Sequence, residues 1–364
     1  MDNIRSVDYE NGTGQEDAVV QTVRIGVIGA GANTRLRHIP NLQSIEGVRV
    51  AVVCNRSEES GRRVAEAFGI ERVTVDPEDV FTSPDIDAVC IGTWPYRHRE
   101  FTVRALAAGK HVLCEARMAM DGREAREMLA ASRARPELVA QLVPAPFDLR
   151  SWRTVRRVLA DGVLGALREV QVTSLNGNAF DLDAPLHWRE RREYSGMNAM
   201  NLGILAETVE RWLGPTVTVV SDASTGIAER VDEESGARTR IEVPDGVAVL
   251  ARMASGVRVT YRVSTVVHSP RDGGGISIFG SRGTLHWSLD DTMVLAMAGE
   301  EARTLPPDAG SAGSWRVERD FVDSIREGAP VELTDFEAGL RYMQFTEAVW
   351  RSWTERRLVE VASL

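Results

Sequence analysis

Lysine is almost absent from this chain of 364 residues, in which 43 residues are lysine or arginine and Lys110 is the only lysine. A Schiff-base lysine, a lysine general base or a phosphate-binding lysine would therefore have to be Lys110. Lys110 follows Gly109 and enters a short apolar run, a pattern that predicts a surface turn at the start of a strand. Parallel α/β proteins bind ligands at the opposite, carboxyl ends of their strands. We therefore expect any chemistry in this protein to proceed without lysine.

Positive net charge and long apolar runs are also missing. The formal net charge is -10, so a nucleic-acid partner is not expected. No apolar run approaches the ~20 residues of a membrane-spanning helix, so we expect no membrane partner. We also expect no bound metal. Residues 1–21 are polar, lack the apolar core of a signal peptide and predict a flexible leader. Cysteine is scarce: Cys54, Cys90 and Cys114 lie in apolar runs, which predicts buried free thiols and a cytoplasmic location.

The first half of the chain alternates short apolar runs with segments of helical length. The apolar runs span 23–28, 48–54, 87–91, 111–114 and 138–143, and the helical segments span 35–45, 58–68, 97–107 and 123–134. Strands separated by helices imply right-handed crossovers and a parallel sheet covered on both faces. We therefore predict an α/β chain whose residues 22–146 form a Rossmann-type dinucleotide-binding domain.

The second half has a different pattern, which begins after Pro146. The predicted elements are helices at 152–159, 198–213, 316–326 and 335–354, and strands at 168–175, within 216–297 and at 357–361. Successive strands without long helices between them indicate a large, open, mostly antiparallel sheet. We therefore predict that residues 147–364 form a second α/β domain.

A glycine-rich turn follows the first predicted strand and opens a helix, the context that a dinucleotide-binding fingerprint requires. Gly29 permits the tight turn, and Gly31 lets backbone approach a pyrophosphate at the helix N-terminus. Thr34 stands in the place of the usual third glycine. The predicted cofactor-binding residues of this turn are Gly29, Gly31, Ala32, Asn33 and Thr34.

The end of the second predicted strand indicates which dinucleotide is bound. It reads Asn55, Arg56, Ser57, where an acidic residue would bind the ribose 2′-hydroxyl of NAD. No carboxylate there would repel a 2′-phosphate, and Arg56 and Ser57 offer it a cation and a hydroxyl. We therefore favour NADP, with NAD as the alternative. In the competing interpretation, Arg56 is a solvated surface arginine.

Further motifs accompany the glycine turn along the chain. They occupy residues 38–40, 85–89, 93–98, 108–115, 195–196, 202–203, 211–214 and 279–285. With these motifs, nearly the whole chain from about Val23 onward resembles the Gfo/Idh/MocA oxidoreductases, a family that includes glucose–fructose oxidoreductase and inositol dehydrogenase.

The resemblance implies an N-terminal Rossmann domain and a C-terminal α/β domain with a large open sheet. In the family, one face of that sheet covers the nicotinamide and the other commonly makes oligomer contacts. We accordingly expect a homo-oligomer, a dimer or a tetramer, that acts on small molecules such as sugars, cyclitols and related polyols or their ketones. Beyond the glycine turn, the residues that the resemblance places around the cofactor are Asn55, Arg56 and Ser57 at the adenosine ribose, Thr93, Trp94 and His98 in the loop beneath the cofactor, and Glu115 on the nicotinamide side.

The catalytic positions of the family are changed in this sequence. The family usually carries Glu-Lys-Pro after the fifth strand, whereas this chain reads Glu115, Ala116, Arg117. Asn201 and Leu205 stand where the family has an aspartate and a histidine that face the substrate. The familiar acid–base pair of lysine and histidine is therefore absent.

Four polar residues are candidates for the catalytic roles, namely Arg117, His187, Tyr194 and Asn201. We predict that Arg117 polarises the reacting oxygen, because a guanidinium binds oxygen in a bidentate way but is a poor base. His187 or Tyr194 would move the proton. Asn201 follows Asn198 by three residues, which predicts a shared helix face suited to hydroxyl recognition. The competing interpretations are a structural histidine, a packed tyrosine ring and an ordinary polar contact.

Three functions fit these residues. The leading hypothesis is NAD(P)-dependent hydride transfer between nicotinamide and a carbinol or carbonyl carbon of a sugar-like, cyclitol or other small polar substrate. In the second, bound NAD(P) transiently oxidises a hydroxyl so that a glycosidic or ether substituent is eliminated, without net consumption of cofactor. In the third, the chain binds the dinucleotide without catalysis, as a sensor or scaffold.

Overall fold

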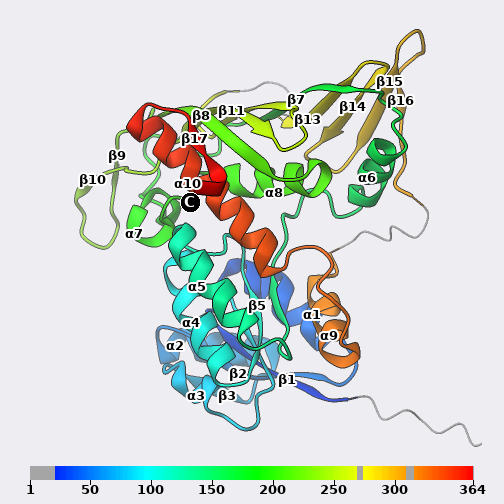
Figure 1. The fold of residues 1–364 in the computed structure, drawn as a ribbon. Coiled ribbons are helices and arrows are strands. Elements are labelled where there is room, and N and C mark those ends of the chain that lie inside the picture. The colour runs from blue at the N-terminus through cyan, green and yellow to red at the C-terminus, as the bar shows by residue number, and fades with distance from the viewer. Residues whose placement is uncertain (1–20, 269–273, 309–314, 364) are drawn as a thin grey trace, which may run out of the picture.

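Two sheets, one parallel and one mostly antiparallel, organise the molecule, and the larger sheet lies above the parallel one in Figure 1. The computed structural model describes residues 21–268, 274–308 and 315–363. The leader predicted at 1–21 lies outside the described residues except for its last position. In the part of the chain that is described, no helix combines the length and the apolar character needed to cross a membrane.

The parallel sheet has six strands in the order β3-β2-β1-β4-β5-β6. The strands are β1 (Val23–Ile28), β2 (Val48–Cys54), β3 (Arg72–Thr74), β4 (Ala88–Ile91), β5 (His111–Cys114) and β6 (Ala140–Leu142). The strand order reverses between β1 and β4. In open α/β sheets the crevice at such a reversal, outside the carboxyl ends of the strands, is where ligands bind.

Helices cover both faces of this sheet, as the fully buried strand β4 requires. One face packs against η1, α1, α2 and α9, with Leu42 and Phe321 in the shared core. The other packs against α3, α4, α5 and the first half of α10, with Phe101 and Met343 in its core. The bounds are η1 (Thr34–His38), α1 (Ile39–Gln43), α2 (Glu58–Phe68), α3 (Glu78–Phe81), α4 (Pro95–Ala107), α5 (Gly122–Arg133), α9 (Val317–Glu327) and α10 (Phe336–Glu355).

The larger sheet has nine strands in the order β16-β15-β14-β13-β7-β12-β11-β8-β17, and only the pair β7 and β12 is parallel. Its inner face packs against α6, α8 and the second half of α10, with Trp212 and Phe345 in the core. Its strands are β7 (Leu167–Leu175), β8 (Thr216–Ser224), β11 (Gly246–Met253), β12 (Arg258–Ser264), β13 (Gly274–Gly280), β14 (Gly283–Ser288), β15 (Met293–Met297), β16 (Arg303–Thr304) and β17 (Val359–Glu360). The remaining elements are α6 (Trp152–Ala160), η2 (Trp188–Glu190), α7 (Arg192–Ser195), α8 (Leu202–Leu213), the hairpin β9 (Glu229–Val231) and β10 (Arg238–Arg240), and η3 (Val361–Ser363).

The α/β fold class predicted from the sequence is confirmed, and β1, β2, α2 and β5 span the predicted residues. The elements β3 and α3 are absent from the prediction because strands and helices of three or four residues are too short to show a periodic pattern. The helix predicted at 198–213 is wrong at its start. Residue Met200 has φ of +47°, which is not helical, and α8 begins only at Leu202. Asn198 and Asn201 therefore do not share a helix face.

The prediction of buried free thiols is confirmed for Cys54, Cys90 and Cys114. Each thiol lies at the end of a strand or within it, packed among apolar side chains. Burial raises the pKa of Cys54 to about 12, so this thiol stays protonated and unreactive at neutral pH.

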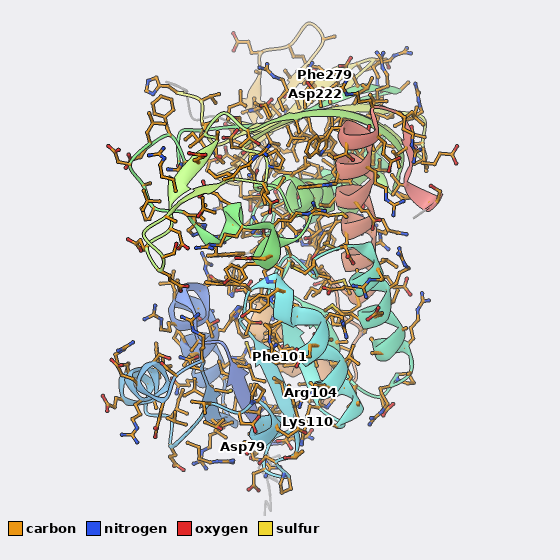
Figure 2. All side chains as sticks on the ribbon, turned by 90° about the vertical axis from the view of Figure 1, so that its left-hand side faces the viewer. Asp79, Phe101, Arg104, Lys110, Asp222 and Phe279 are labelled. Carbon is orange, nitrogen blue, oxygen red and sulfur yellow. The ribbon has the colours of Figure 1, made fainter. Side chains whose placement is uncertain are left out.

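Lys110 is buried, so the prediction that it lies on the surface is wrong. Only 8% of the residue is exposed, and its Nζ donates to the carbonyl oxygens of Ser83 and Ile86, each at 2.7 Å. These carbonyls belong to the loop between α3 and β4, which the ammonium ties to the start of β5. Figure 2 shows Lys110 at the end of the molecule remote from the large sheet. The residue therefore stabilises a loop at the amino ends of the strands.

Lys110→Met tests this structural role. The substitution keeps an unbranched apolar side chain but removes the ammonium donor from the carbonyls of Ser83 and Ile86, so we expect the free energy of unfolding to fall by about 1–3 kcal/mol. Urea denaturation measures this. Arg49→Met is the control, because Arg49 and its partner Glu71 have side chains 55% and 72% exposed and such pairs contribute less than about 1 kcal/mol. Equal stability of the two variants would contradict the role of Lys110.

Candidate dinucleotide and substrate site

Close approach of the backbone shapes the glycine turn between β1 and η1. Gly29 has φ of +84°, and a Cβ at this position would lie 2.6 Å from the methyl carbon of Thr93. The Thr34 hydroxyl donates to the Gly29 carbonyl at 3.2 Å, and a Cβ at Gly92 would overlap that hydroxyl. Gly31 differs, because the atom nearest to a Cβ there would be the Gly92 oxygen, at 3.7 Å. Gly31 therefore leaves open the space that a pyrophosphate at this turn requires.

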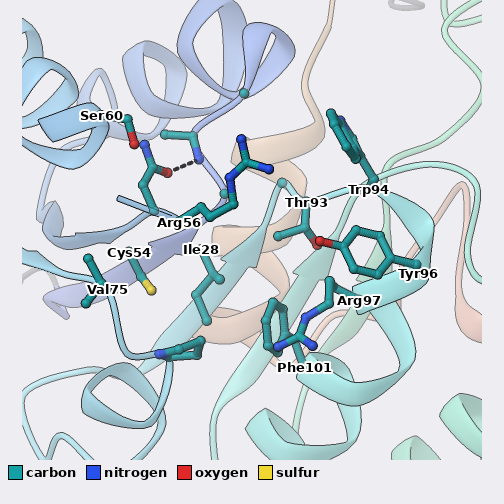
Figure 3. A pocket seen from close by; sticks show the side chains of 16 residues that line it. Ile28, Cys54, Arg56, Ser60, Val75, Thr93, Trp94, Tyr96, Arg97 and Phe101 are labelled. Carbon is teal, nitrogen blue, oxygen red and sulfur yellow. Dashed lines mark hydrogen bonds between the residues drawn. The ribbon is translucent and has the colours of Figure 1, made fainter. Parts of the chain in front are cut away.

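A first cavity of about 490 Å³ opens beside the turn, at the carboxyl ends of β1, β2 and β4. In Figure 3, Arg56, Ser60, Cys54 and Val75 lie on one side of it and Tyr96, Arg97 and Phe101 lie on the other. The other residues that line it are Ile28, Gly29, Ala30, Gly31, Asn55, Pro77, Gly92, Thr93 and Trp94. The mixture of apolar walls and a few polar groups suits an adenosine with its ribose.

The three residues predicted at the ribose take different positions. Asn55 accepts a hydrogen bond from the Ala30 N–H at 2.8 Å, so its side chain holds the glycine turn. Ser57 caps α2 by accepting from the Ser60 N–H at 3.3 Å, and Ser60 lines the cavity in its place. The preference of serine for helix N-caps is the sequence signal that indicates this role for Ser57. Arg56 is exposed, lines the cavity and has no ion-pair partner within the described residues.

A second cavity, of about 470 Å³, lies beside the first, where the two halves of the chain meet. Gly31, Gly92, Thr93 and Trp94 line both cavities. The remaining lining residues are Ala32, Asn33, Thr34, Arg37, Pro95, Glu115, Ala116, Arg117, Val143, Pro144, Pro146, His187, Trp188, Arg189, Ile204 and Trp315. The glycine turn thus borders both cavities.

Glu115 belongs to a buried network that the sequence analysis did not predict. One of its carboxylate oxygens accepts hydrogen bonds from the Asn33 amide and from His38 Nε2, the latter at 3.0 Å. His38 is fully buried, and its Nδ1 contacts Glu318 at the start of α9. The imidazole therefore lies between two carboxylates that are about 200 residues apart in the chain.

This arrangement decides the charge of the network. Burial disfavours an imidazolium, but the hydrogen bonds with Glu115 and Glu318 outweigh burial and raise the pKa of His38 to about 9. Burial likewise opposes the charge of Glu115, but the same contact with His38 lowers its pKa. Glu115 is therefore an ionised carboxylate committed to His38 at neutral pH, and a poor general base.

His98, predicted in the loop beneath the cofactor, is fully buried and lines neither cavity. Its ring nitrogens lie 2.8 Å from the Thr93 carbonyl and 3.0 Å from the Arg117 carbonyl. The ring thus links the loop shared by the two cavities to the segment after β5. His98 acts as a positioning residue in this structure.

Arg117 lines the second cavity and is half-buried. Its guanidinium donates to the carbonyl of Met200, the residue with the unusual φ of +47°. A non-glycine residue in this region is strained, and such strain is common at functional sites. Burial, with the nearby charge of Arg189, lowers the pKa of Arg117, although a guanidinium stays protonated at neutral pH.

His187 is exposed and lines the second cavity. Its Nδ1 accepts a hydrogen bond from the Arg189 N–H at 3.2 Å, so the neutral ring carries its proton on Nε2. Burial of part of the ring, followed by the charge of Arg189, lowers the pKa of His187. The ring is therefore neutral at pH 7 and can donate from Nε2.

Tyr194 lines neither cavity and packs in an aromatic cluster at their shared rim. Its ring centroid lies 5.1 Å from that of Trp94 and 5.3 Å from that of Tyr96. Trp94 also stacks on Trp188, with centroids 5.2 Å apart and planes 11° from parallel. The cluster joins α4 to η2 and α7 and so connects the two halves of the site.

Asn201 also lies outside the cavity linings. Its amide donates to the Ser174 hydroxyl at 2.9 Å, which ties the start of α8 to β7. Asn198 is buried and donates to the carbonyls of Ala119 and Ser195 at 2.8 and 2.7 Å. Of the four candidate catalytic residues, the structure thus brings Arg117 and His187 together in one cavity and leaves Tyr194 and Asn201 outside it.

His38→Gln tests the buried network, because glutamine can donate a hydrogen bond but carries no charge. The pKa of His38 is raised from 6.5 to about 9, so the imidazolium stabilises the fold fully below pH 6.5 and loses this effect as the pH rises through about 9. We expect the variant to be less stable than the wild type by roughly 3 kcal/mol near pH 6, with the gap closing near pH 10. Urea denaturation over this pH range measures it.

His111→Gln is the control for that pH dependence. Burial lowers the pKa of His111, so its contribution to stability cannot fall as the pH rises. A stability gap for His38→Gln that does not change with pH would contradict the charged network.

Models of known protein families match both halves of the chain. Residues 23–141 match the model of an "Oxidoreductase family, NAD-binding Rossmann fold", and residues 152–286 match the "GFO/IDH/MocA C-terminal domain". The structure itself shows no metal site in the described part of the chain, where no group of three or more histidine, cysteine, aspartate or glutamate side chains is placed to hold a metal ion.

Several of the relatives are named dehydrogenases. Levoglucosan dehydrogenase of Pseudarthrobacter phenanthrenivorans is 25% identical over 356 residues, which cover 86% of this chain and 90% of the relative. Inositol 2-dehydrogenase of Klebsiella pneumoniae is 32% identical over 148 residues, 40% of this chain and 43% of the relative. A solved levoglucosan dehydrogenase in complex with NADH and L-sorbose has the same fold, with a TM-score of 0.84 at 22% identity over 93% of this chain and 99% of that one. As its motifs predict, the chain belongs to the Gfo/Idh/MocA family of oxidoreductases.

Proposed function

We propose that this protein is a nicotinamide-dependent dehydrogenase that interconverts a carbinol and a carbonyl group on a sugar-like, cyclitol or related small polyol. When bound, the dinucleotide supplies the hydride acceptor or donor at nicotinamide C4. The family membership and the dehydrogenase relatives support this reaction class. The residues of this chain would orient the reactants and polarise the reacting oxygen.

The observation that carries the proposal is that the two cavities adjoin at the glycine turn. They share the wall formed by Gly31 and by residues 92–94, so a ligand that spans both must pass the open space beside Gly31. A dinucleotide fits this shape, with adenosine in the first cavity and pyrophosphate at the glycine turn. The second cavity then holds the nicotinamide and the substrate, next to Asn33 and Glu115.

We propose NADP as the preferred dinucleotide. Arg56 lines the first cavity and has no ion-pair partner within the described ranges, so its guanidinium is available to a 2′-phosphate. The acidic residues that follow it are engaged elsewhere, since Glu58 pairs with Arg62 and Glu59 pairs with Arg63. Neither of those pairs lines the first cavity.

Arg117 and His187 are the residues that we propose polarise the reacting oxygen. Each can donate a hydrogen bond into the second cavity, from the guanidinium and from Nε2 respectively. Two fixed donors stabilise the negative charge that develops on this oxygen while hydride is transferred. His187 has its Nδ1 engaged and its Nε2 protonated, so it cannot accept the proton that carbinol oxidation releases. A water molecule at the exposed side of His187 would accept that proton, and would supply it when the carbonyl is reduced.

We further propose that the outer face of the large sheet forms contacts between subunits. Val220 of β8 and Leu250 of β11 are direct neighbours in register, and they are 44% and 50% exposed. Adjacent apolar side chains on an exposed sheet face are common where subunits associate.

Arg117→Gln tests the catalytic proposal. With a panel of polyols and ketoses, we expect turnover to fall by about 100-fold or more, because a fixed donor to the developing charge is lost. The dissociation constant of NADPH, measured by fluorescence titration, should change by less than about twofold. Arg282→Gln is the matched control, since Arg282 also donates to a backbone carbonyl, that of Gly162, but lines neither cavity.

The cofactor balance of the same assay separates the competing functions. Net oxidation or reduction of one dinucleotide per product supports the dehydrogenase, whereas product without net consumption supports the lyase. Turnover that is unaffected by Arg117→Gln would contradict the role of Arg117. Binding of NADPH without turnover of any compound in the panel would favour a sensor or scaffold.

Arg56→Ala tests the cofactor preference. We expect KM for NADPH to rise about tenfold or more, through loss of a charged hydrogen bond, while KM for NADH changes by less than about twofold. Arg62→Ala removes the same charge six residues away, from an arginine paired with Glu58, and should affect neither constant selectively. A wild-type enzyme that prefers NADH, or an Arg56→Ala variant that weakens both cofactors equally, would contradict the proposal.

A further inference from the structure

The charges that line the second cavity do not balance. Three arginines, Arg37, Arg117 and Arg189, face it together with one carboxylate, that of Glu115. Glu115 is already engaged by His38 and Asn33. The cavity that receives the substrate is therefore strongly cationic without any ligand.

Arg189 is the arginine of this cavity for which neither the structure nor the proposed function provides an anionic partner. Within the described residues its guanidinium forms no ion pair, although it follows an acidic segment and precedes Glu190. Glu190 is taken by Arg230 at 2.8 Å and by the His187 N–H at 2.9 Å. The next arginine, Arg191, is paired with Asp232, and Arg192, which forms no ion pair within the described residues, lines neither cavity.

Aromatic packing holds Arg189 in place. Its guanidinium carbon lies 4.3 Å from the centroid of the Trp188 ring, which in turn stacks on Trp94. A guanidinium restrained in this way loses little conformational freedom when it binds an anion. The charge of Arg189 also acts on Arg117, where it adds to the effect of burial in lowering the pKa of that side chain. Glu115 acts on both guanidinium groups through its charge but forms an ion pair with neither, so an anion bound between the two cations would stabilise them.

The cofactor pyrophosphate is the competing partner for this charge. The pyrophosphate site, however, is the glycine turn beside Gly31, to which Arg37 is the nearest of the three arginines in the chain, at the end of η1. Arg37 also packs on Trp315, at 4.3 Å from its ring centroid. Arg189 reaches the cavity from η2, on the other half of the chain, next to His187. This placement assigns Arg189 to the substrate.

We propose that the substrate is an anionic polyol, with a carboxylate or a phosphate ester that binds Arg189 while its reacting oxygen faces Arg117. The assignment of the reacting oxygen rests on the proposed function, but the anion site does not. Arg189 would thus determine specificity without taking part in hydride transfer. Carboxylate and phosphate share the oxygen geometry that a guanidinium binds in a bidentate way.

The test compares three hexoses that differ only at carbon 6: D-glucose, D-glucuronate and D-glucose 6-phosphate. Binding to the wild-type protein saturated with NADPH is measured by isothermal titration calorimetry. We expect at least one anion to bind about tenfold or more tightly than D-glucose, with a gap that narrows as NaCl is raised from about 0.05 to 0.5 M. Which anion binds more tightly decides between a carboxylate and a phosphate ester.

Arg189→Gln should remove this gap by weakening the anion about tenfold or more, while D-glucose and NADPH bind as in the wild type. Arg192→Gln is the matched control, since Arg192 is three residues away, packs on Trp350 and lines neither cavity. The difference in affinity between the anion and D-glucose should be the same in this control variant as in the wild type. The proposal is overturned if D-glucose binds as tightly as both anions, if neither anion binds at up to about 10 mM, or if the gap survives in Arg189→Gln. Weaker NADPH binding by Arg189→Gln, with the gap intact, would assign this arginine to the cofactor instead.

The outcome for the anion site is independent of the outcome for the dehydrogenase. Tight binding of an anion that depends on Arg189, without hydride transfer to or from any compound, would support the anion site but contradict the proposed function. Turnover of neutral polyols with no preference for anions would contradict the anion site but support the proposed dehydrogenase function.

Discussion

One buried imidazolium between two carboxylates holds Glu115 at the wall of the second cavity. His38 receives Glu115 from the end of β5 and Glu318 from the start of α9, segments that only the folded chain brings together. His38 holds Glu115 within the network, so Glu115 forms no ion pair with the arginines of the cavity that it lines, although its charge still acts on Arg117 and Arg189. Three arginines against this one carboxylate leave the cavity with an excess of positive charge, from which the proposed preference for an anionic substrate follows.

A site without lysine must use groups that hold their protons. A guanidinium fixes and polarises oxygen but is a poor base at neutral pH. Arg117 is held by the Met200 carbonyl, and His187 keeps its Nδ1 engaged by the Arg189 N–H, so both present donors to the cavity. The account that results is catalysis by orientation and charge stabilisation, with the redox chemistry left to the dinucleotide.

Patterns within short segments of the sequence predict those features that depend on short segments alone. Strand and helix periods located β1, β2, α2 and β5, and the glycine turn indicated the cofactor loop. Contacts between distant segments were beyond these rules: Glu318 lies 280 residues from His38, and no spacing in the sequence pairs them. Lys110 was misplaced for a related reason, because the carbonyls that bury its ammonium belong to a loop before β4. Ser57 was assigned to the cofactor although the serine preference for N-caps already favoured its structural role.

The most direct test of the account is a crystal structure of the protein with NADPH and an anionic hexose derivative, which locates Glu115 relative to its partners. The account predicts that Glu115 stays bound to His38 and that the anion contacts Arg189. The account is contradicted if Glu115 turns from His38 to form an ion pair with Arg117 or Arg189, because the cavity would then carry its own counter-ion.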